Sequence, residues 1–283
     1  YGGNGANGGN GANGANDANG AIDEGAAALA DALALINAAE RPVLMVGRGV
    51  LSAGMVEELR TLAERADLPD VTTLLALDAF PADEPRALGM PGMHGSERAN
   101  RAIQAADVIL GLGLRFDDRV TGDVRRFAPG AAIIHADIRP VQIGLTVRPR
   151  VRLAGDLRET LPALLDGVRP ARRPEWWAKL REWSREAAPA ADAFTEPVGR
   201  LTGRAAARGL ARRIADEGAI VATDVGQHQM LIAQELGAAA PGTHLTSGGL
   251  GTMGYSLPAA IGAALAGSDR PVWAVAGDGG FQM

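Results

Sequence analysis

Apolar residues recur in two alternating periods along the first half of the chain. Steps of three and four from Ile22 to Ile36 predict an amphipathic helix that ends at Arg41-Pro42. Short, mostly apolar runs follow, separated by further helical patterns, and predict strands at 43–47, 71–75, 108–113, 133–138 and 151–155. Strands buried on both faces read as continuous apolar runs, so we expect a parallel sheet covered by helices on both sides. The fold class is α/β, with a Rossmann-like central domain over residues 22–167.

The same alternation resumes at Leu201 and predicts a second α/β domain over residues 201–283. Its expected elements are a helix to Asp216, a strand at 219–224, a helix over 229–236, a glycine-rich helix start and a strand at 272–280. A doubly wound domain needs further helices and strands after that strand. We therefore expect this domain to be incomplete at its carboxyl end.

Two segments lie outside these domains. Residues 168–200 contain several prolines and a short helical pattern that places Trp176, Leu180 and Trp183 on one face, which predicts a linker whose helix packs against a domain. Residues 1–21 form a low-complexity run of glycine, asparagine and alanine. Such a run has little to bury against the entropy cost of ordering, so we expect disorder there.

Composition narrows the classes of function. The 283 residues carry a net charge of −5 and no cysteine, which excludes disulfides, thiolate catalysis and cysteine-based zinc sites. No basic block indicates a nucleic-acid partner, and no apolar run is long enough to cross a membrane. Because no signal peptide is evident at the start, we expect a cytoplasmic protein.

One glycine motif supports two interpretations. Gly249, Gly251 and Gly254 have the spacing of a dinucleotide fingerprint, and they open a predicted helix. However, the acidic residue further on, Asp278, lies in a Gly-Asp-Gly-Gly turn. A carboxylate that holds Mg²⁺ against a diphosphate needs such flanking glycines, since backbone must approach the phosphates closely. A dinucleotide oxidoreductase and a diphosphate-cofactor enzyme both stay open on this evidence.

Longer segments resemble the large subunits of acetolactate (acetohydroxyacid) synthases, which depend on thiamine diphosphate. Those similar to the family's thiamine diphosphate segments are VGQHQM (225–230), LTSGGLGTMGYSLPAAIGAAL (245–265) and GDGGFQM (277–283). Those similar to its FAD-carrying central domain are LGMPGMHGSERAN (88–100), GLRFDDRVTG (113–122) and IIHADIRPVQIG (133–144). The run RFDDRVTG is far more specific than any glycine spacing here.

The resemblance implies a transferase that decarboxylates pyruvate and joins the product to a second 2-keto acid. The products would be 2-acetolactate or 2-aceto-2-hydroxybutyrate, in branched-chain amino-acid (valine and isoleucine) biosynthesis. It also implies a homodimer or higher homo-oligomer and leaves open whether a small regulatory subunit binds. Another thiamine diphosphate carboligase or decarboxylase, such as a glyoxylate carboligase, is the first alternative, and a dinucleotide-dependent oxidoreductase the second.

The family's activating glutamate belongs to a separate pyrimidine-binding domain, which the sequence before Ile22 does not contain. We therefore assign no catalytic residue to this chain. We expect the chain alone to be inactive, and to bind thiamine diphosphate weakly.

The resemblance assigns cofactor roles to individual residues. For thiamine diphosphate these are Gly226, Gln227, His228, Gly251, Met253, Gly277, Asp278, Gly279 and Gly280. Asp278 would also ligate Mg²⁺, the Gly251 carbonyl would meet the aminopyrimidine, and Met253 would bend the cofactor. The alternatives are a surface histidine for His228 and an ordinary core methionine for Met253.

For FAD the resemblance implies a second set, spread over four segments. It comprises Gly47, Arg48, Gly49, Gly92, Met93, His94, Gly113, Arg115, Asp117, Val120, Asp137 and Ile138. Two positions depart from the family pattern. The first loop reads Gly47-Arg48-Gly49 where three glycines are frequent, which leaves FAD binding open, and Asp78 stands where a small residue is more usual.

Overall fold

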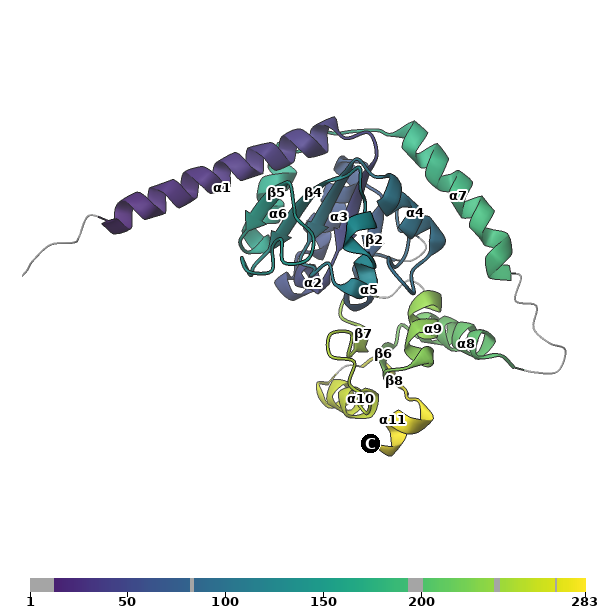
Figure 1. Cartoon of the computed structure of the whole chain (residues 1–283). Helices are drawn as coiled ribbons and strands as arrows, with labels where there is room; N and C mark the ends of the chain where they lie inside the picture. The colour runs from purple at the N-terminus through teal and green to yellow at the C-terminus, as the bar shows by residue number, and fades with distance from the viewer. Residues whose placement is uncertain (1–12, 82–83, 193–200, 237–239, 268) are drawn as a thin grey trace, which may run out of the picture.

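The computed structural model describes residues 13–81, 84–192, 201–236, 240–267 and 269–283. They form a larger central domain and a smaller second unit that lies below it in Figure 1. Among the described helices, none is long and apolar enough to cross a membrane.

The central domain contains a five-stranded parallel sheet in the order β2-β1-β3-β4-β5. Its strands are β1 (Pro42–Val46), β2 (Asp70–Thr72), β3 (Val108–Leu112), β4 (Ala132–Asp137) and β5 (Val151–Ala154). All five predicted strands are confirmed. The second is shorter than predicted, because the backbone turns into the 3-10 helix η1 (Leu74–Ala79) directly after Thr73.

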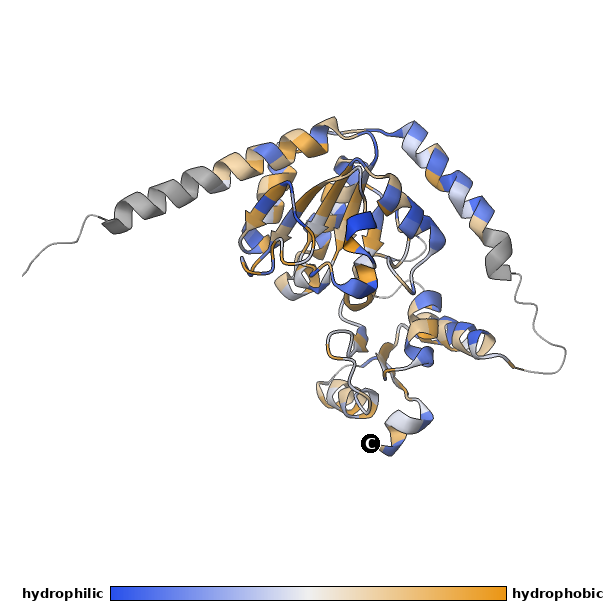
Figure 2. Cartoon of the chain, viewed as in Figure 1, coloured by the Kyte–Doolittle hydropathy of each residue, from blue (hydrophilic) through white to orange (hydrophobic). Residues whose placement is uncertain are grey.

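Helices cover both faces of this sheet, as predicted. In β1, Leu44 and Val46 pack into one core with α1 (Asn13–Ala38), α2 (Arg48–Ala53), α3 (Val56–Arg65) and α6 (Leu157–Gly167). Val43 and Met45 pack into the opposite core with α4 (Glu97–Ala105) and α7 (Pro174–Asp192). Successive side chains of a strand point to opposite faces of the sheet, and here both faces are covered by a core. Every position of such a strand therefore favours an apolar residue, which produces the continuous apolar runs in the sequence. Figure 2 shows the resulting hydrophobic strands.

The two outlying segments behave differently from each other. Trp176 and Leu180 are buried, and the Trp176 indole N–H donates to the Pro42 carbonyl at 3.1 Å, so the predicted packing of this helix on a domain is confirmed. By contrast, α1 begins at Asn13, and the disorder predicted for residues 13–21 is not observed. Extending an existing helix avoids the cost of nucleation, which composition alone does not reveal. Residues 1–12 lie outside the described part.

The second unit has a three-stranded parallel sheet in the order β7-β6-β8. Its elements are α8 (Gly203–Asp216), β6 (Ile220–Thr223), α9 (Gln227–Glu235), β7 (His244–Thr246), α10 (Ser256–Leu265), β8 (Val272–Val275) and α11 (Asp278–Gln282). The strand predicted over 272–280 ends at Val275, and Asp278 begins a helix instead. Glycine is unfavourable in strands, so the glycines at 277, 279 and 280 account for the early end of the strand.

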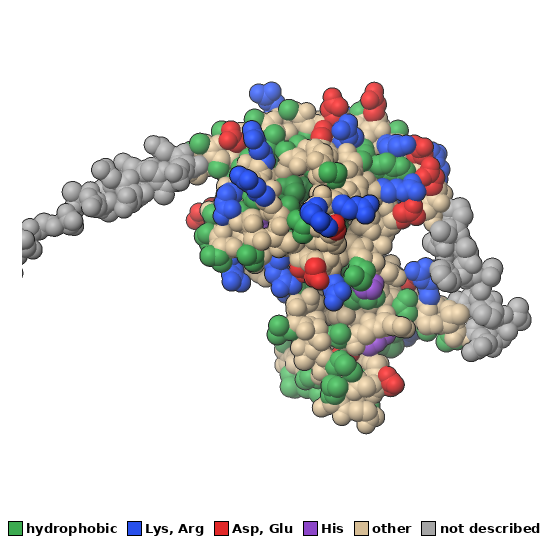
Figure 3. Space-filling model, in the orientation of Figure 1, with side chains coloured by type: hydrophobic (Ala, Val, Ile, Leu, Met, Phe, Trp, Pro, Cys, Tyr) green, Lys and Arg blue, Asp and Glu red, His purple; other side chains and the backbone are tan. Residues whose placement is uncertain are grey.

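The surfaces of the two units differ. In the view of Figure 3, charged side chains of both signs are interspersed over the central domain, whereas hydrophobic side chains gather on the second unit. The exposed hydrophobics there include Leu257, Ile261 and Leu265 of α10.

Two short elements complete the central domain, α5 (Asp118–Thr121) and the 3-10 helix η2 (Val124–Arg126).

Candidate cofactor site

A cavity of about 780 Å³ lies between the central domain and the second unit. The turns after β1, β2 and β3 line it from one side, and the turns after β6 and β7 from the other. The carboxyl ends of parallel strands are where ligands bind in open α/β sheets. Seven residues of the predicted FAD set line the cavity: Gly47, Arg48, His94, Gly113, Arg115, Asp117 and Val120. From the predicted thiamine diphosphate set, Gly226 and Gly251 line it.

Three glycines hold the turns after β1 and β3 against each other. The Gly47 N–H donates to the Leu112 carbonyl at 2.9 Å, and the Gly49 N–H to the Gly113 carbonyl at 3.0 Å. A Cβ on Gly49 would lie 2.7 Å from the Gly113 Cα, and one on Gly47 would collide with the Gly113 carbonyl oxygen. These glycines are thus required by backbone packing, and Gly49 itself lies outside the cavity lining.

The loop Gly92-Met93-His94 reaches the cavity through His94 alone. Gly92 has a φ of +89°, and the Met93 N–H donates to the Arg119 carbonyl at 2.9 Å, which docks the loop onto α5. The Asn100 side chain accepts from the Gly92 N–H at 2.7 Å and donates to its carbonyl at 2.9 Å. Asn100 was missed by sequence reasoning. Asparagine is unfavourable inside a helix, so an asparagine at position 100 of α4 could have indicated a role outside the helix itself.

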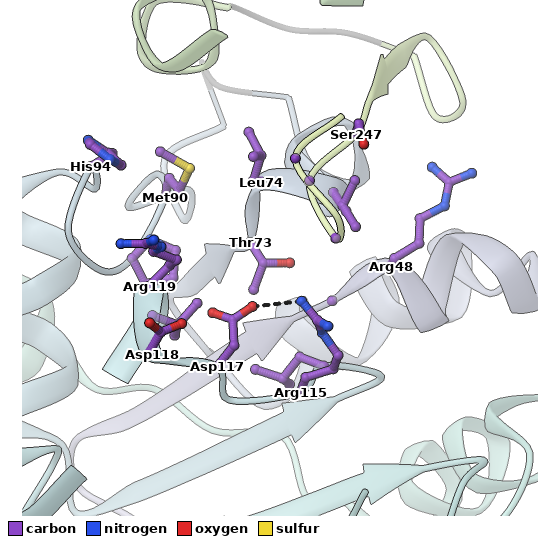
Figure 4. A pocket seen from close by; sticks show the side chains of 18 of the residues that line it. Arg48, Thr73, Leu74, Met90, His94, Arg115, Asp117, Asp118, Arg119 and Ser247 are labelled. Carbon is purple, nitrogen blue, oxygen red and sulfur yellow. Dashed lines mark hydrogen bonds and ion pairs between the residues drawn. The ribbon is translucent and has the colours of Figure 1, made fainter. Parts of the chain in front are cut away.

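Arg115 and Asp117 form an ion pair on the cavity wall, with Nη2 and Oδ2 2.9 Å apart (Figure 4). The Oδ1 atom of Asp117 is buried and has no hydrogen-bond partner among the described residues. A buried polar atom without a partner is costly, and a ligand donor would satisfy it. Arg115, which is half-exposed, offers a cation to a phosphate group.

Asp137 and Ile138, also expected at the FAD site, lie outside the cavity lining. The Asp137 Oδ1 accepts the Arg139 N–H at 2.8 Å, within its own turn. His135, two residues earlier on the same strand, supports the cavity instead. The buried His135 Nε2 is 2.9 Å from the Leu114 carbonyl, and the ring contacts Phe116 edge-on. Burial lowers the pKa of His135, so a neutral imidazole donates this bond.

His228 joins two of the expected thiamine diphosphate segments. A Cβ on either Gly226 or Gly277 would lie 2.9 Å from its Cε1 atom, so both turns pass close to the ring. Its Nε2 is buried and has no partner among the described residues, which disfavours the alternative of an ordinary surface histidine. Gly226 begins α9 without a side-chain cap from the described part of the chain, leaving backbone N–H groups for an anion. Gln227 is exposed beside it.

The remaining expected residues cluster beside this turn. Met253 is 41% exposed, which disfavours the core alternative, and a Cβ on Gly279 would lie 3.0 Å from its Cε. Asp278 is exposed at the start of α11. The described residues hold no group of three or more histidines and carboxylates that could bind a metal. Mg²⁺ commonly combines one or two carboxylates with substrate phosphates, and Asp278 fits that pattern.

The fold and these turns are those of an open α/β protein that binds its ligand at strand ends, and comparison with known families identifies the class. A model described as "Thiamine pyrophosphate enzyme, central domain" matches residues 29–164, and one described as "Thiamine pyrophosphate enzyme, C-terminal TPP binding domain" matches residues 224–283. The chain belongs to this family. Its membership favours a thiamine diphosphate cofactor over the dinucleotide interpretation of Gly249, Gly251 and Gly254.

Within the family, the chain is similar to acetolactate synthases. It is 44% identical to the acetolactate synthase large subunit of Corynebacterium glutamicum over 260 residues, 90% of this chain and 41% of that protein. It is 44% identical to the acetolactate synthase isozyme 1 large subunit of Escherichia coli, covering 90% and 44%. The mitochondrial acetolactate synthase catalytic subunit of Saccharomyces cerevisiae is 41% identical, covering 89% and 38%. The chain spans less than half the length of these relatives.

Proposed function

We propose that this chain is the part of an acetolactate synthase large subunit that binds FAD and the diphosphate end of thiamine diphosphate. One observation carries the proposal: the turns that resemble the family's FAD segments and the turns that resemble its thiamine diphosphate segments line the same cavity. Similarity to three synthases over about nine-tenths of the chain supports it. The whole protein would join pyruvate to a second 2-keto acid.

The thiamine diphosphate site would use the residues that meet around His228. The α9 N-terminus and the His228 Nε2 would face the diphosphate, and Asp278 would ligate Mg²⁺ together with phosphate oxygens. The exposed Met253 would support the organic part of the cofactor. When bound, thiamine diphosphate supplies the carbanion chemistry that the protein only orients.

The FAD site would use the central-domain wall of the cavity. The Arg115 guanidinium would meet the FAD diphosphate, and the unpartnered Asp117 Oδ1 would accept a bond from the flavin nucleotide. The close packing of Gly47 on Gly113 would leave the backbone of the first loop accessible to FAD. This packing is present although Arg48 lies between the two glycines of that loop. The flavin would be structural, and no redox step is assigned to it.

The partners follow from the same assignment. Because the relatives are named as large or catalytic subunits, we infer a small regulatory subunit as a partner. A homo-oligomeric catalytic assembly and a cytoplasmic location are proposed from the sequence alone. The substrates would be pyruvate and a second 2-keto acid.

Thermal unfolding with added ligands tests this function, since a ligand that binds only the folded state stabilises it. We expect FAD to raise the melting temperature of the wild-type chain, and thiamine diphosphate with MgCl₂ to raise it by a smaller, saturable amount. NAD⁺ should have no effect. Replacing Arg115 with alanine should reduce the FAD shift and leave the thiamine diphosphate shift unchanged. Stabilisation by NAD⁺ alone would contradict the proposal.

A further inference from the structure

Asp224 follows β6 directly and is completely buried, with 0% of its surface exposed. It lies outside the cavity lining, and the resemblance assigns it no role. A carboxyl group in such a place is costly unless hydrogen bonds compensate for the lost water. The identity of its partners therefore indicates what the residue does.

The partners of Asp224 are backbone N–H groups of the glycine turn that precedes α10. Its Oδ1 accepts from the Gly254 N–H at 2.9 Å and from the Tyr255 N–H at 3.3 Å, and its Oδ2 is 3.0 Å from the same Gly254 nitrogen. It also accepts from the adjacent Val225 N–H at 2.9 Å. One side chain thus closes a turn that is 30 positions away in the sequence.

The other end of that turn is tied to Ser247. The Gly251 N–H donates to the Ser247 carbonyl, and the Thr252 N–H to the Ser247 Oγ, both at 3.0 Å. Ser247 at one end and Asp224 at the other therefore fix the backbone between them. This is the stretch that presents Gly251 and Met253.

A third segment also meets Asp224. A Cβ on Gly280 would collide with the Asp224 Oδ2, so only glycine lets α11 come this close. Gly280 is buried there, two residues after the start of α11 at Asp278. The absent side chain at Gly280 makes room for Asp224. The carboxyl group thus touches the segments that carry Val225-Gly226, the glycine turn and Asp278.

We propose that Asp224 is a positioning residue, which holds the three thiamine diphosphate segments in register without touching the cofactor. The proposal rests on the proposed function, since it assumes that these segments bind thiamine diphosphate. Bonds to a carboxylate are stronger than those to a neutral acceptor, and removing the acceptor leaves buried N–H groups without a partner. Losing the Asp224 side chain should therefore make the glycine turn more mobile without unfolding the second unit.

Amide hydrogen exchange of the full chain without cofactors tests the contact itself. Three variants are compared with wild type: Asp224→Ala removes both oxygens, Asp224→Asn keeps one, and Thr223→Val is the matched control. Thr223 is also fully buried on β6, and its hydroxyl donates to the Thr246 Oγ1 at 2.8 Å and not to the Gly254–Tyr255 end of the glycine turn. We expect exchange at Gly254 and Tyr255 to accelerate about 10- to 100-fold in Asp224→Ala, less in Asp224→Asn, and not in Thr223→Val.

Affinity for thiamine diphosphate with MgCl₂ tests the positioning role in the same proteins. Asp224→Ala should weaken binding at least tenfold, Asp224→Asn should recover part of it, and Thr223→Val should bind like wild type. FAD affinity should stay unchanged in all three. Where Asp224→Ala does not fold, Asp224→Asn against Thr223→Val gives the same comparison.

The two assays separate failure of the inference from failure of the proposed function. Unchanged exchange at Gly254 and Tyr255 in both Asp224 variants overturns the inference. So does unchanged cofactor affinity in Asp224→Ala when wild type binds. Absence of thiamine diphosphate binding by wild type overturns the proposed function instead, and the positioning role with it.

Discussion

Asp78 and Gly242, which are 164 positions apart, are joined by a hydrogen bond between the central domain and the second unit. The Gly242 N–H donates to the Asp78 Oδ2 at 2.7 Å, and the His244 N–H donates to the same oxygen at 3.3 Å. Asp78 is fully buried at the end of η1, and His244 begins β7, which leads into the cavity-lining turn. Asp78 thus ties the two units together.

Replacing Asp78 with alanine should weaken this tie. Two backbone N–H groups lose their acceptor, so we expect the free energy of unfolding to fall by about 1–3 kcal/mol. Urea unfolding measures it, with Asp166→Ala, an exposed position on α6, as the control. An equal loss in the two variants would contradict the role of Asp78.

Asp70 should make stability depend on pH. The pKa of Asp70 is raised from its ordinary 3.8 to about 7, chiefly by burial and further by the negative charge of Glu84. The positive charges of Arg98 and Arg86 lower it, but by less. Neither carboxyl oxygen has a hydrogen-bond partner among the described residues. The folded state then binds a proton that the unfolded state has released, so this contribution to stability is present below pH 3.8 and is lost as the pH rises towards 7.

The Asp70→Asn variant removes this titration. Its free energy of unfolding relative to wild type should increase between pH 4 and 7, reaching an advantage on the order of a few kcal/mol at pH 8. The comparison with wild type is needed because burial lowers the pKa values of His135 and His244, and these residues give the opposite slope. A difference that stays constant with pH would refute the prediction; Asp166→Asn serves as the control.

Gly49 allows the turns after β1 and β3 to approach closely, so adding a methyl group at this position should lower both stability and FAD affinity. In Gly49→Ala the new Cβ would lie 2.7 Å from the Gly113 Cα, so the turns after β1 and β3 must separate. We expect a loss of about 1–3 kcal/mol in stability and weaker FAD binding. Gly209→Ala in α8 is the control, since no described atom lies within 4 Å of its Cβ, and alanine should stabilise that helix slightly. Equal FAD affinity in wild type and Gly49→Ala would argue against this cavity wall as the FAD site.

Asp278 should be needed for the binding of thiamine diphosphate with Mg²⁺ but not for the binding of FAD. Asp278→Asn weakens a hard oxygen ligand, so thiamine diphosphate with MgCl₂ should stabilise this variant far less than wild type. FAD should stabilise both equally. Asp269→Asn, also exposed in the second unit, is the control, and an unchanged thiamine diphosphate shift in Asp278→Asn would remove Asp278 from the metal site.

The sequence predicted the inner strands of the central sheet well because they are buried on both faces, which leaves a continuous apolar signal at Val43–Val46 and Val108–Leu112. Several of the expected site segments line the cavity, whereas Asp137 and Ile138, which also follow a strand, lie outside its lining. The sequence could not predict the contacts of Asp78, Asn100 and Asp224. Each depends on a backbone group brought close only by the fold, 8 to 164 positions away. The helical start at Asn13 was missed for a related reason, since composition does not report a helix that continues from its neighbour.

The central claim is that the FAD and thiamine diphosphate sites open into one cavity. Adding thiamine diphosphate and MgCl₂ to the FAD-loaded chain, while following flavin fluorescence, tests it most directly. The account predicts a saturable change in the flavin signal for wild type, and a much weaker one for Asp278→Asn. Thiamine diphosphate binding detected by calorimetry, with no change in flavin fluorescence, would contradict a shared cavity.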